Sequence, residues 1–296
     1  PNDGIPEEQQ GSTHEIQASP DGLIWITQQK QGRLVRFDPS SGDMEFFDLG
    51  AETGPHGLIY QDENAIWITL EFANEIIRVN DAGQIVDGFK LPDEATGPHG
   101  LAQASDGALW WTGKESGAIG RLDPNTGDTQ VVKLDGPNTK PIYLSQGPEG
   151  NMWFTELEGS RVSKITPQGQ IERFEVPFEN ARPIEVLPGP DGRIWYTEER
   201  GNAYGTITQD GAFERFPTGV EGGKLAGAVF GPEGHLWIQF NTPDIVQRIN
   251  PGAGPDTFAL PTKGAVQHRI TVGPEGGIWF TELAADRIGH IPREDQ

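Results

Sequence analysis

Short alternating segments recur along the whole chain. In "QIERFEVP" (170–177) apolar and polar residues alternate, and such segments follow shorter runs like "RVSKITP" (161–167) and "RIGHIPR" (287–293). Alternation with a period of two is typical of strands that bury one face. We therefore expect an all-β protein built from many short strands.

Seven of the eight tryptophans fall in one register. Their spacing is 42 or 43 residues throughout, and the eighth, Trp111, is the neighbour of one of them. A turn such as "GPEG" (147–150, 231–234 and 273–276) precedes the tryptophan in most units, and the copy at 61–64 reads "QDEN". Pro presets φ and Gly supplies a positive φ in such turns. The seven repeated tryptophans are Trp25, Trp67, Trp110, Trp153, Trp195, Trp237 and Trp279.

Four short strands in about 42 residues is the size of one propeller blade. Seven such units close into a ring without exposed sheet edges. We predict a seven-bladed β-propeller with four-stranded antiparallel blades, forming a single domain over residues 1–296. A β-solenoid is disfavoured because it normally has shorter repeats and distinctive caps. The last unit ends at "RIGHIPREDQ" after three strands, so we expect residues 1–11, around Gly4–Glu8, to supply the fourth.

Composition narrows the function classes. The chain has 40 Gly, 24 Pro and no Cys, which excludes disulfides, thiolate metal sites and cysteine nucleophiles. A net charge of −22 disfavours binding to nucleic acid or anionic membranes. We expect a monomer that binds neither. The start at Pro1 rather than Met slightly favours a secreted or periplasmic protein over a cytoplasmic one.

Four of the six histidines share one position of the repeat, eleven residues before the tryptophan. "TGPHG" at 53–57 and 96–100 contains two of them, and the other three units have Ile142, Ile184 and Ala226 there. The position begins the first, innermost strand of a blade, so we expect these imidazoles to face the mouth of the central channel. The four are His14, His56, His99 and His268. A repeated histidine that only bonds a neighbouring loop is the alternative interpretation.

Polar residues also follow the tryptophan strand, where the loop to the third strand should reach the same end as the histidines. Glu71 belongs to the unit of His56, and Lys114 to the unit of His99. We expect the glutamates of the "W-x-T-E" segments to be exposed strand-end residues. These are Glu156, Glu198 and Glu282.

The units "GPEGNMWFTELEGSRVSKITPQGQIERFEVP" (147–177) and "GPEGGIWFTELAADRIGHIP" (273–292) resemble repeats of the streptogramin B lyase family, also called virginiamycin B lyases. The resemblance covers essentially the whole chain. It implies a seven-bladed propeller that opens a cyclic depsipeptide by elimination, in which a base removes a proton beside the ester and Mg²⁺ assists.

Single residues can be matched to the family pattern. "PHG" at 55–57 and "WITLE" at 67–71 fit it, which implies His56 as the base, His14 as a substrate contact and Glu71 as a metal or water ligand. Where the family has a metal-binding Glu, two residues before the histidine, this chain has no acid. The residues at that position are Ser12, Gly54, Gly97 and Val266.

Three functions therefore remain open. The first is a lyase acting on a small-molecule or peptide substrate at the channel mouth, with His56 as base and with His14, His99, His268 and Lys114 as substrate contacts. The second is a transition-metal site, since four imidazoles favour Zn²⁺, Cu²⁺ or Fe²⁺ over Mg²⁺. The third is a non-catalytic binding module, because function does not follow from fold.

Overall fold

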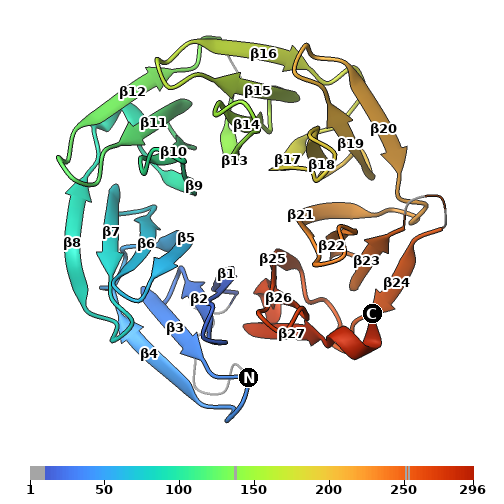
Figure 1. The fold of residues 1–296 in the computed structure, drawn as a ribbon, viewed down its shortest axis with the longest axis horizontal. Helices are drawn as coiled ribbons and strands as arrows, with labels where there is room; N and C mark the ends of the chain where they lie inside the picture. Colours follow the sequence, from blue (N-terminus) through green and yellow to red (C-terminus); the bar gives the residue numbers. More distant parts are fainter. Residues whose placement is uncertain (1–10, 137–138, 251, 253) are drawn as a thin grey trace. The chain divides into compact units, whose positions relative to one another are not determined.

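The computed structural model describes residues 11–136, 139–250, 252 and 254–296. Strands make up nearly all of its regular structure, with single 3-10 turns at Asp93–Ala95, Leu283–Ala285 and Arg293–Asp295. Within these residues the strands form six sheets of four strands and one of three. The chain is thus a seven-bladed β-propeller, as predicted (Figure 1). The predicted fourth strand of the last blade, around Gly4–Glu8, lies outside the described residues.

The chain divides into two compact units. The first joins Pro1–Gly88 to Gly227–Gln296, and the second is Phe89–Ala226. The prediction of a single domain over 1–296 stays a prediction, and each unit is described by itself. In the described part of the chain, no helix has the length and apolar character that a membrane span requires.

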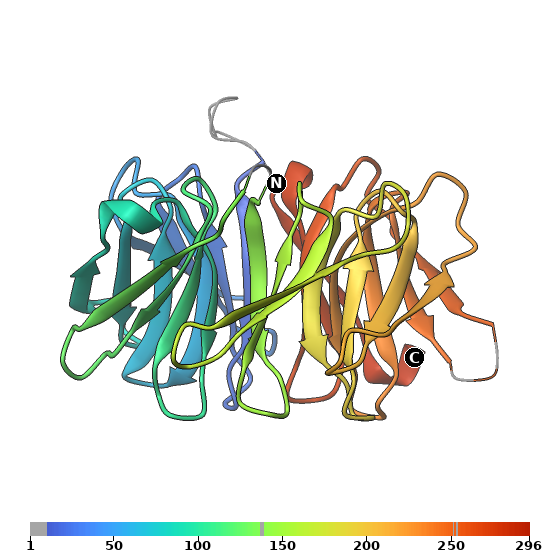
Figure 2. The ribbon, with the colours of Figure 1, turned by 90° about the horizontal axis from the view of Figure 1, so that it is seen from above.

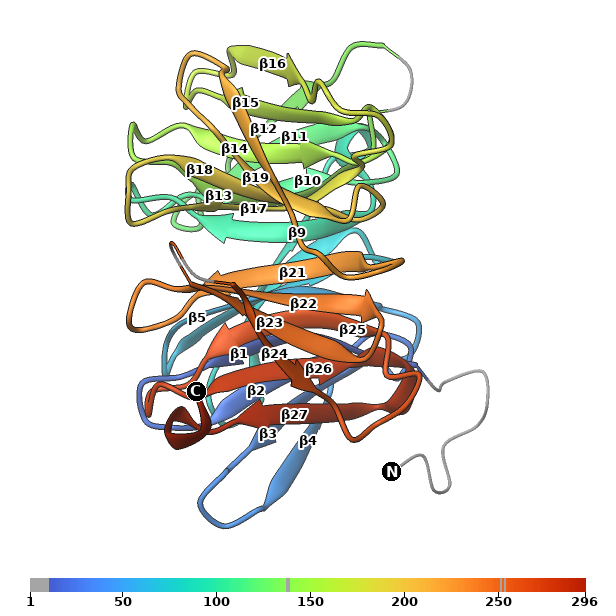
Figure 3. The ribbon, with the colours of Figure 1, turned by 90° about the vertical axis from the view of Figure 1, so that its right-hand side faces the viewer.

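Four blades belong to the first unit, although β8 and β21 run across its boundaries. Blade 1 consists of β1 (Thr13–Ala18), β2 (Ile24–Gln28), β3 (Arg33–Phe37) and β4 (Met44–Asp48). Blade 2 consists of β5 (Pro55–Asp62), β6 (Ala65–Leu70), β7 (Glu75–Val79) and β8 (Ile85–Lys90). Blade 6 consists of β21 (Lys224–Phe230), β22 (Leu236–Thr242), β23 (Ile245–Ile249) and β24 (Asp256–Ala259). Blade 7 consists of β25 (Gln267–Val272), β26 (Ile278–Glu282) and β27 (Arg287–Ile291). Blade 7 lies directly beside blade 1 (Figures 1 and 3).

The second unit contains blades 3, 4 and 5. Blade 3 consists of β9 (Pro98–Gln103), β10 (Leu109–Gly113), β11 (Ala118–Leu122) and β12 (Thr129–Lys133). Blade 4 consists of β13 (Pro141–Gln146), β14 (Met152–Glu156), β15 (Arg161–Ile165) and β16 (Ile171–Glu175). Blade 5 consists of β17 (Pro183–Pro188), β18 (Ile194–Glu198), β19 (Ala203–Ile207) and β20 (Phe213–Pro217). In each blade the strands run between two sets of loops (Figure 2).

The histidine position lies near the start of the first strand, as predicted. His14, His56 and His268 are each the second residue of β1, β5 and β25. The loop from the second to the third strand reaches the same end. The backbone N–H of Gln29 donates to the carbonyl of Ser12, and that of Glu71 donates to the carbonyl of Gly54.

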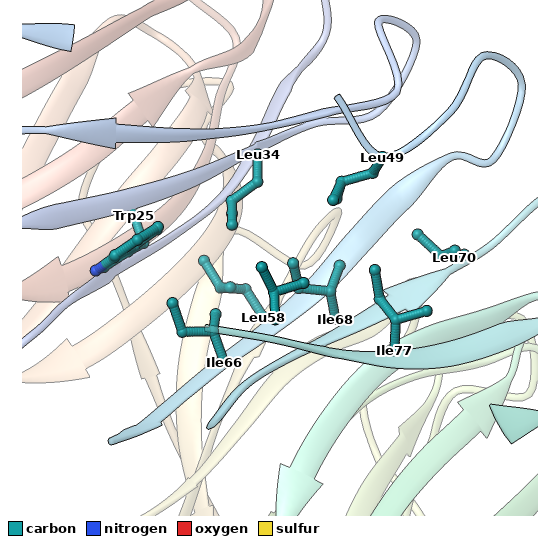
Figure 4. Close-up of a cluster of buried hydrophobic side chains, with 9 residues drawn as sticks. Trp25, Leu34, Leu49, Leu58, Ile66, Ile68, Leu70 and Ile77 are labelled. Carbon is teal, nitrogen blue, oxygen red and sulfur yellow. The ribbon is translucent and has the colours of Figure 1, made fainter. Parts of the chain in front are cut away.

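Apolar side chains fill the space between neighbouring blades. Between blades 1 and 2, Trp25, Leu34 and Leu49 pack against the inner strands of blade 2. Figure 4 shows this cluster, in which side chains from the two blades face one another. Burial of large apolar side chains of this kind is the main favourable term in folding. The blade 2 residues of the cluster include Leu58, Ile66, Ile68, Leu70 and Ile77.

Basic side chains lie over the rings of the repeated tryptophans. Trp25 is paired with Arg36 across β2 and β3, and the guanidinium lies 5.6 Å from the ring centroid. In blade 7 the equivalent partner is His290, whose ring stacks on Trp279 at 3.9 Å. The other cation–π pairs of the repeated tryptophans are Arg78–Trp67, Arg121–Trp110, Lys164–Trp153, Arg193–Trp195 and Arg248–Trp237.

In blades 1, 3, 4, 5 and 7 a threonine two residues after the tryptophan joins the blade to the next one, whereas blade 6 has Gln239 at this position. The hydroxyl of Thr27 accepts from the N–H of Glu15 in its own blade at 3.1 Å and donates to the carbonyl of His56 in blade 2 at 3.0 Å. Thr281 donates in the same way to the carbonyl of His14 at 2.8 Å, which links blade 7 to blade 1. In the second unit the threonine hydroxyl donates to the backbone carbonyl of the next blade in the same way, in the pairs Thr112–Ile142, Thr155–Ile184 and Thr197–Ala226.

A second link joins blade 7 to blade 1. The carboxylate of Asp286, just before β27, accepts hydrogen bonds from the backbone N–H groups of Gly11, Ser12 and Thr13 at 2.7 to 3.0 Å. The Thr13 hydroxyl also donates to it, at 3.2 Å. Residues about 275 positions apart in the chain are thereby held together.

We expect Thr27→Val to lower the free energy of unfolding by about 2–4 kcal/mol, because it leaves a buried N–H and a buried carbonyl without their partner. Chemical denaturation followed by tryptophan fluorescence measures this. Thr129→Val makes the same exchange on the outer strand β12, where no side-chain hydrogen bond is formed within the described residues, and should change stability by less than about 0.5 kcal/mol. Equal effects of the two substitutions would contradict the bridging role.

Asp286→Asn should lower the free energy of unfolding by about 1–3 kcal/mol, because a neutral amide replaces a carboxylate that accepts four hydrogen bonds. Asn also tolerates the left-handed backbone at this residue, where φ is 48°. Asp43→Asn is the control, because it removes one negative charge at an exposed carboxylate and so measures the effect of the charge change alone. A loss no greater than that of the control would show that the Asp286 link contributes nothing.

Candidate functional site

A bulge at the start of the first strand positions the candidate residues. In blade 1, Thr13 pairs with Gln28 and Ile16 with Ile26, so that His14 and Glu15 lie opposite Thr27 alone. Blade 7 has the same register shift, with His268 and Arg269 opposite Thr281. A bulge re-aims side chains that regular pairing would send to opposite faces.

Three of the four predicted histidines come together in the first unit. The ring centroids of His14 and His56 are 5.0 Å apart, those of His14 and His268 are 4.9 Å apart, and those of His56 and His268 are 5.7 Å apart. Each offers a ring nitrogen within 4.8 Å of the others. Only 1% of the His56 side chain is exposed, whereas His268 keeps 17%. We call this trio the histidine cluster.

A buried carboxylate lies against the cluster. Oε1 of Glu15 is 3.8 Å from Nδ1 of His56 and 3.8 Å from Nε2 of His268. Oε2 of Glu15 is 3.0 Å from Nε of Arg269, which supplies a full positive charge. Since only 7% of the Glu15 side chain is exposed, its charge requires such a partner. The group is thus an Arg–Glu pair that touches two imidazoles.

The orientation of His14 is set by the backbone. Its Nδ1 lies 2.8 Å from the carbonyl of Ser12, which can only accept, so Nδ1 carries a proton and Nε2 is the nitrogen that has the lone pair when the ring is neutral. Glu71 lies near the cluster from the loop after β6. It offers a carboxylate oxygen within 4.8 Å of a ring nitrogen of His56, and its Oε2 accepts from Nε2 of Gln29 at 2.6 Å.

His99 and Lys114 belong to the second unit. His99 is buried and packs edge-on against Tyr143, with ring centroids 5.2 Å apart. Lys114 is half-buried in the loop after β10 and borders a shallow pocket of about 270 Å³ together with Ser116, Thr139 and Glu158. Their role as substrate contacts stays a prediction.

The sequence and the structures of known proteins agree on the family. A model of the Virginiamycin B lyase family matches residues 4–126 and 86–296, which together span nearly the whole chain. The chain belongs to this family. A solved streptogramin B lyase is 26% identical, with a TM-score of 0.88 over 96% of this chain and 94% of its own. The virginiamycin B lyase of Staphylococcus aureus is 25% identical, with a TM-score of 0.87 over 95% of this chain and 94% of its own. A comparison with curated proteins gave no match.

The residues present do not fit the Mg²⁺ that the virginiamycin B lyase resemblance implies. Mg²⁺ requires near-octahedral oxygen ligands, but Glu15 is engaged by Arg269 and Glu71 by Gln29. Two residues before His56 the chain has Gly54, which offers no carboxylate. Gly54 has a φ of 65°, and a Cβ there would lie 2.6 Å from the ring of Phe72. Among the described residues of this unit, apart from Glu71, the metal-binding side chains grouped with His56 are the imidazoles of His14 and His268.

The expectation that the "W-x-T-E" glutamates are exposed is wrong. Glu156 and Glu198 are fully buried and Glu282 is 3% exposed, because the second strand is covered on both faces up to its last residue. Arginines from later strands of the same blade neutralise two of them. Arg173 lies 3.1 Å from Glu156, and Arg215 lies 2.8 Å from Glu198. Oε2 of Glu282 has no hydrogen-bond partner among the residues that the structure describes.

Sequence reasoning missed Glu15 and Arg269, the charged part of this candidate site. One signal was available. The residue after the histidine position is glycine in blades 2, 3 and 6, and is charged in only three blades. A charge on an innermost strand needs a buried partner, so its presence there marks a possible site. The three charged residues are Glu15, Glu185 and Arg269.

We expect Arg269→Met to lower the free energy of unfolding by about 2 kcal/mol or more, because it leaves the buried Glu15 carboxylate without its cation. The double variant with Glu15→Gln should recover most of this loss, which a double-mutant cycle by denaturation measures. Lys140→Met breaks the exposed pair with Glu158 and should cost less than about 1 kcal/mol. Additive effects of the Arg269 and Glu15 substitutions would contradict a coupled pair.

Proposed function

We propose that this protein is a carbon–oxygen lyase of the streptogramin B lyase type, which opens a cyclic depsipeptide or a related ester by elimination. The observation that carries the proposal is the histidine cluster, in which two imidazoles share one buried carboxylate, in a chain of the virginiamycin B lyase family. Elimination needs a base that works near neutral pH, and imidazole is the side chain suited to it.

In the proposed reaction a base removes a proton from the carbon adjacent to the one that bears the ester oxygen. The electrons of that C–H bond form a C=C bond, and the C–O bond breaks with its electron pair leaving on the carboxylate. No water is added, so the product is a linear isomer of the substrate. The developing negative charge requires nearby positive charge or donors.

The base is one of the two imidazoles that flank Glu15. His56 is the residue assigned from the sequence, and Glu15 lies beside its Nδ1. His268 has the same relation to Glu15 and is the more accessible of the two. The carboxylate favours the imidazolium that proton removal creates, as a buried acid does beside a catalytic histidine. His14, with Nε2 unprotonated, is a substrate contact and accepts a hydrogen bond.

We expect the untagged protein to convert a streptogramin B into a ring-opened product of unchanged mass, which liquid chromatography with mass spectrometry detects. Alanine at the true base should lower kcat by about 10²–10⁴-fold, so the His56→Ala and His268→Ala variants separate the two candidates. His235→Ala, in a turn outside the cluster, is the control and should match the unsubstituted protein.

Three outcomes would overturn the proposal. A product that gains the mass of water would indicate hydrolysis instead of elimination. Full activity in both the His56→Ala and the His268→Ala variants would place the chemistry elsewhere. Turnover of no streptogramin B and of no simple ester with a β-leaving carboxylate would also count against a lyase.

A further inference from the structure

We propose that the histidine cluster binds one divalent transition-metal ion, with Zn²⁺ as the expected occupant, through His14, His56 and His268. Binding of the ion does not depend on the lyase proposal. One consequence does rest on it: the ion takes up the nitrogen lone pairs that a base would use, so the metal-loaded protein should not catalyse the proposed elimination.

The spacing of the three rings suits a single ion. Each has a ring nitrogen within 4.8 Å of the other two. Zn²⁺ binds imidazole nitrogen at about 2.0–2.1 Å, which places neighbouring nitrogens of a tetrahedral site about 3.4 Å apart. Small rotations about the side-chain bonds therefore bring the three nitrogens to one ion. Three protein ligands leave the fourth position open.

Each ring also has a polar partner for a second nitrogen. Nδ1 of His14 donates to the Ser12 carbonyl at 2.8 Å, so Nε2 is the nitrogen through which this ring would bind an ion. Glu15 lies 3.8 Å from Nδ1 of His56 and from Nε2 of His268, so a small shift lets it accept from both. Metal-binding histidines almost always donate their other N–H to a carbonyl or a carboxylate, which orients the ring. Arg269 holds Glu15 in place for this role.

The backbone that carries the three rings is fixed by hydrogen bonds. Thr27 holds the carbonyl of His56, and Thr281 holds the carbonyl of His14. The bulges place His14 and His268 opposite the same two threonines. Ligands on strands held in this way lose little freedom when an ion binds, which favours affinity.

The donor set selects the class of ion. Imidazole nitrogens suit Zn²⁺, Cu²⁺, Fe²⁺ and Ni²⁺, whereas Mg²⁺ and Ca²⁺ prefer oxygen. The cluster offers three nitrogens, and the carboxylate beside it is engaged by Arg269. The site therefore differs in ion class from the Mg²⁺ that the family resemblance implies.

The test uses the whole untagged protein after treatment with a chelator. Zn²⁺ or Co²⁺ is added in the presence of excess Mg²⁺, which saturates weak carboxylate sites on an acidic surface. We expect one tightly bound equivalent by elemental analysis, and a visible Co²⁺ spectrum typical of four or five ligands. His14→Ala and His268→Ala should each lower the Zn²⁺ affinity at least tenfold, and Glu15→Gln by about 10–100-fold. His235→Ala should leave it unchanged.

Less than stoichiometric Zn²⁺ and Co²⁺ in the folded protein would overturn the proposal, and so would unchanged affinity in the His14→Ala/His268→Ala double variant. Circular dichroism checks that each variant is folded. If an alanine variant is not, His268→Gln, at the more exposed ring, replaces it in the test. The amount of bound metal and the metal affinity are both measured without a substrate. Failure of the lyase proposal would therefore not affect the test of metal binding. If elimination is observed, Zn²⁺ should abolish it and a chelator should restore it. Retained elimination by the Zn²⁺-loaded protein would refute the consequence drawn for the base.

Discussion

The hydrogen bond of a buried threonine to the next blade is the constraint on which the site depends. Thr27 and Thr281 each face a bulge in their own blade and hold the backbone of the following first strand. A bulge lets two consecutive side chains leave the strand on one side of the pairing, and the hydroxyl supplies the bond that the ladder loses there. The repeat thus generates irregular backbone at the same place in blades 1, 2, 3, 4, 5 and 7, where side chains can change without loss of the sheet.

The side chains at the bulge of the first strand differ from blade to blade. In blade 1 the bulge presents an imidazole and a carboxylate, in blade 7 an imidazole and a guanidinium, and in blade 2 an imidazole and Gly57. These add up to a compact group in which opposite charges compensate each other inside the protein. In the second unit the first residue of the bulge is His99 in blade 3, and it is the apolar Ile142 and Ile184 in blades 4 and 5. One scaffold therefore carries both polar and apolar versions of the same inner strand.

Much of the fold could be predicted because it is periodic. The spacing of the tryptophans predicted the number of blades, and the turns before them predicted where the chain reverses ahead of each tryptophan strand, since these features follow from local rules. The shared position of His14, His56 and His268 followed from the same period. Glu15 could not be assigned this way, because its contacts depend on a bulge that period-two reasoning does not contain. The exposure of Glu156 was mispredicted because its partner Arg173 lies two strands later.

The excess of acidic residues over basic ones, some of which lie over the tryptophan rings, has a consequence for the electric field around the protein. Of the 22 lysines and arginines, six stand over these rings, where they serve packing. Against 44 acidic residues, the surrounding solution carries a dense counter-ion atmosphere. Small cations then meet the molecule faster than diffusion alone allows, and anionic molecules meet it more slowly. At high ionic strength, where screening acts within about 3 Å, this bias disappears.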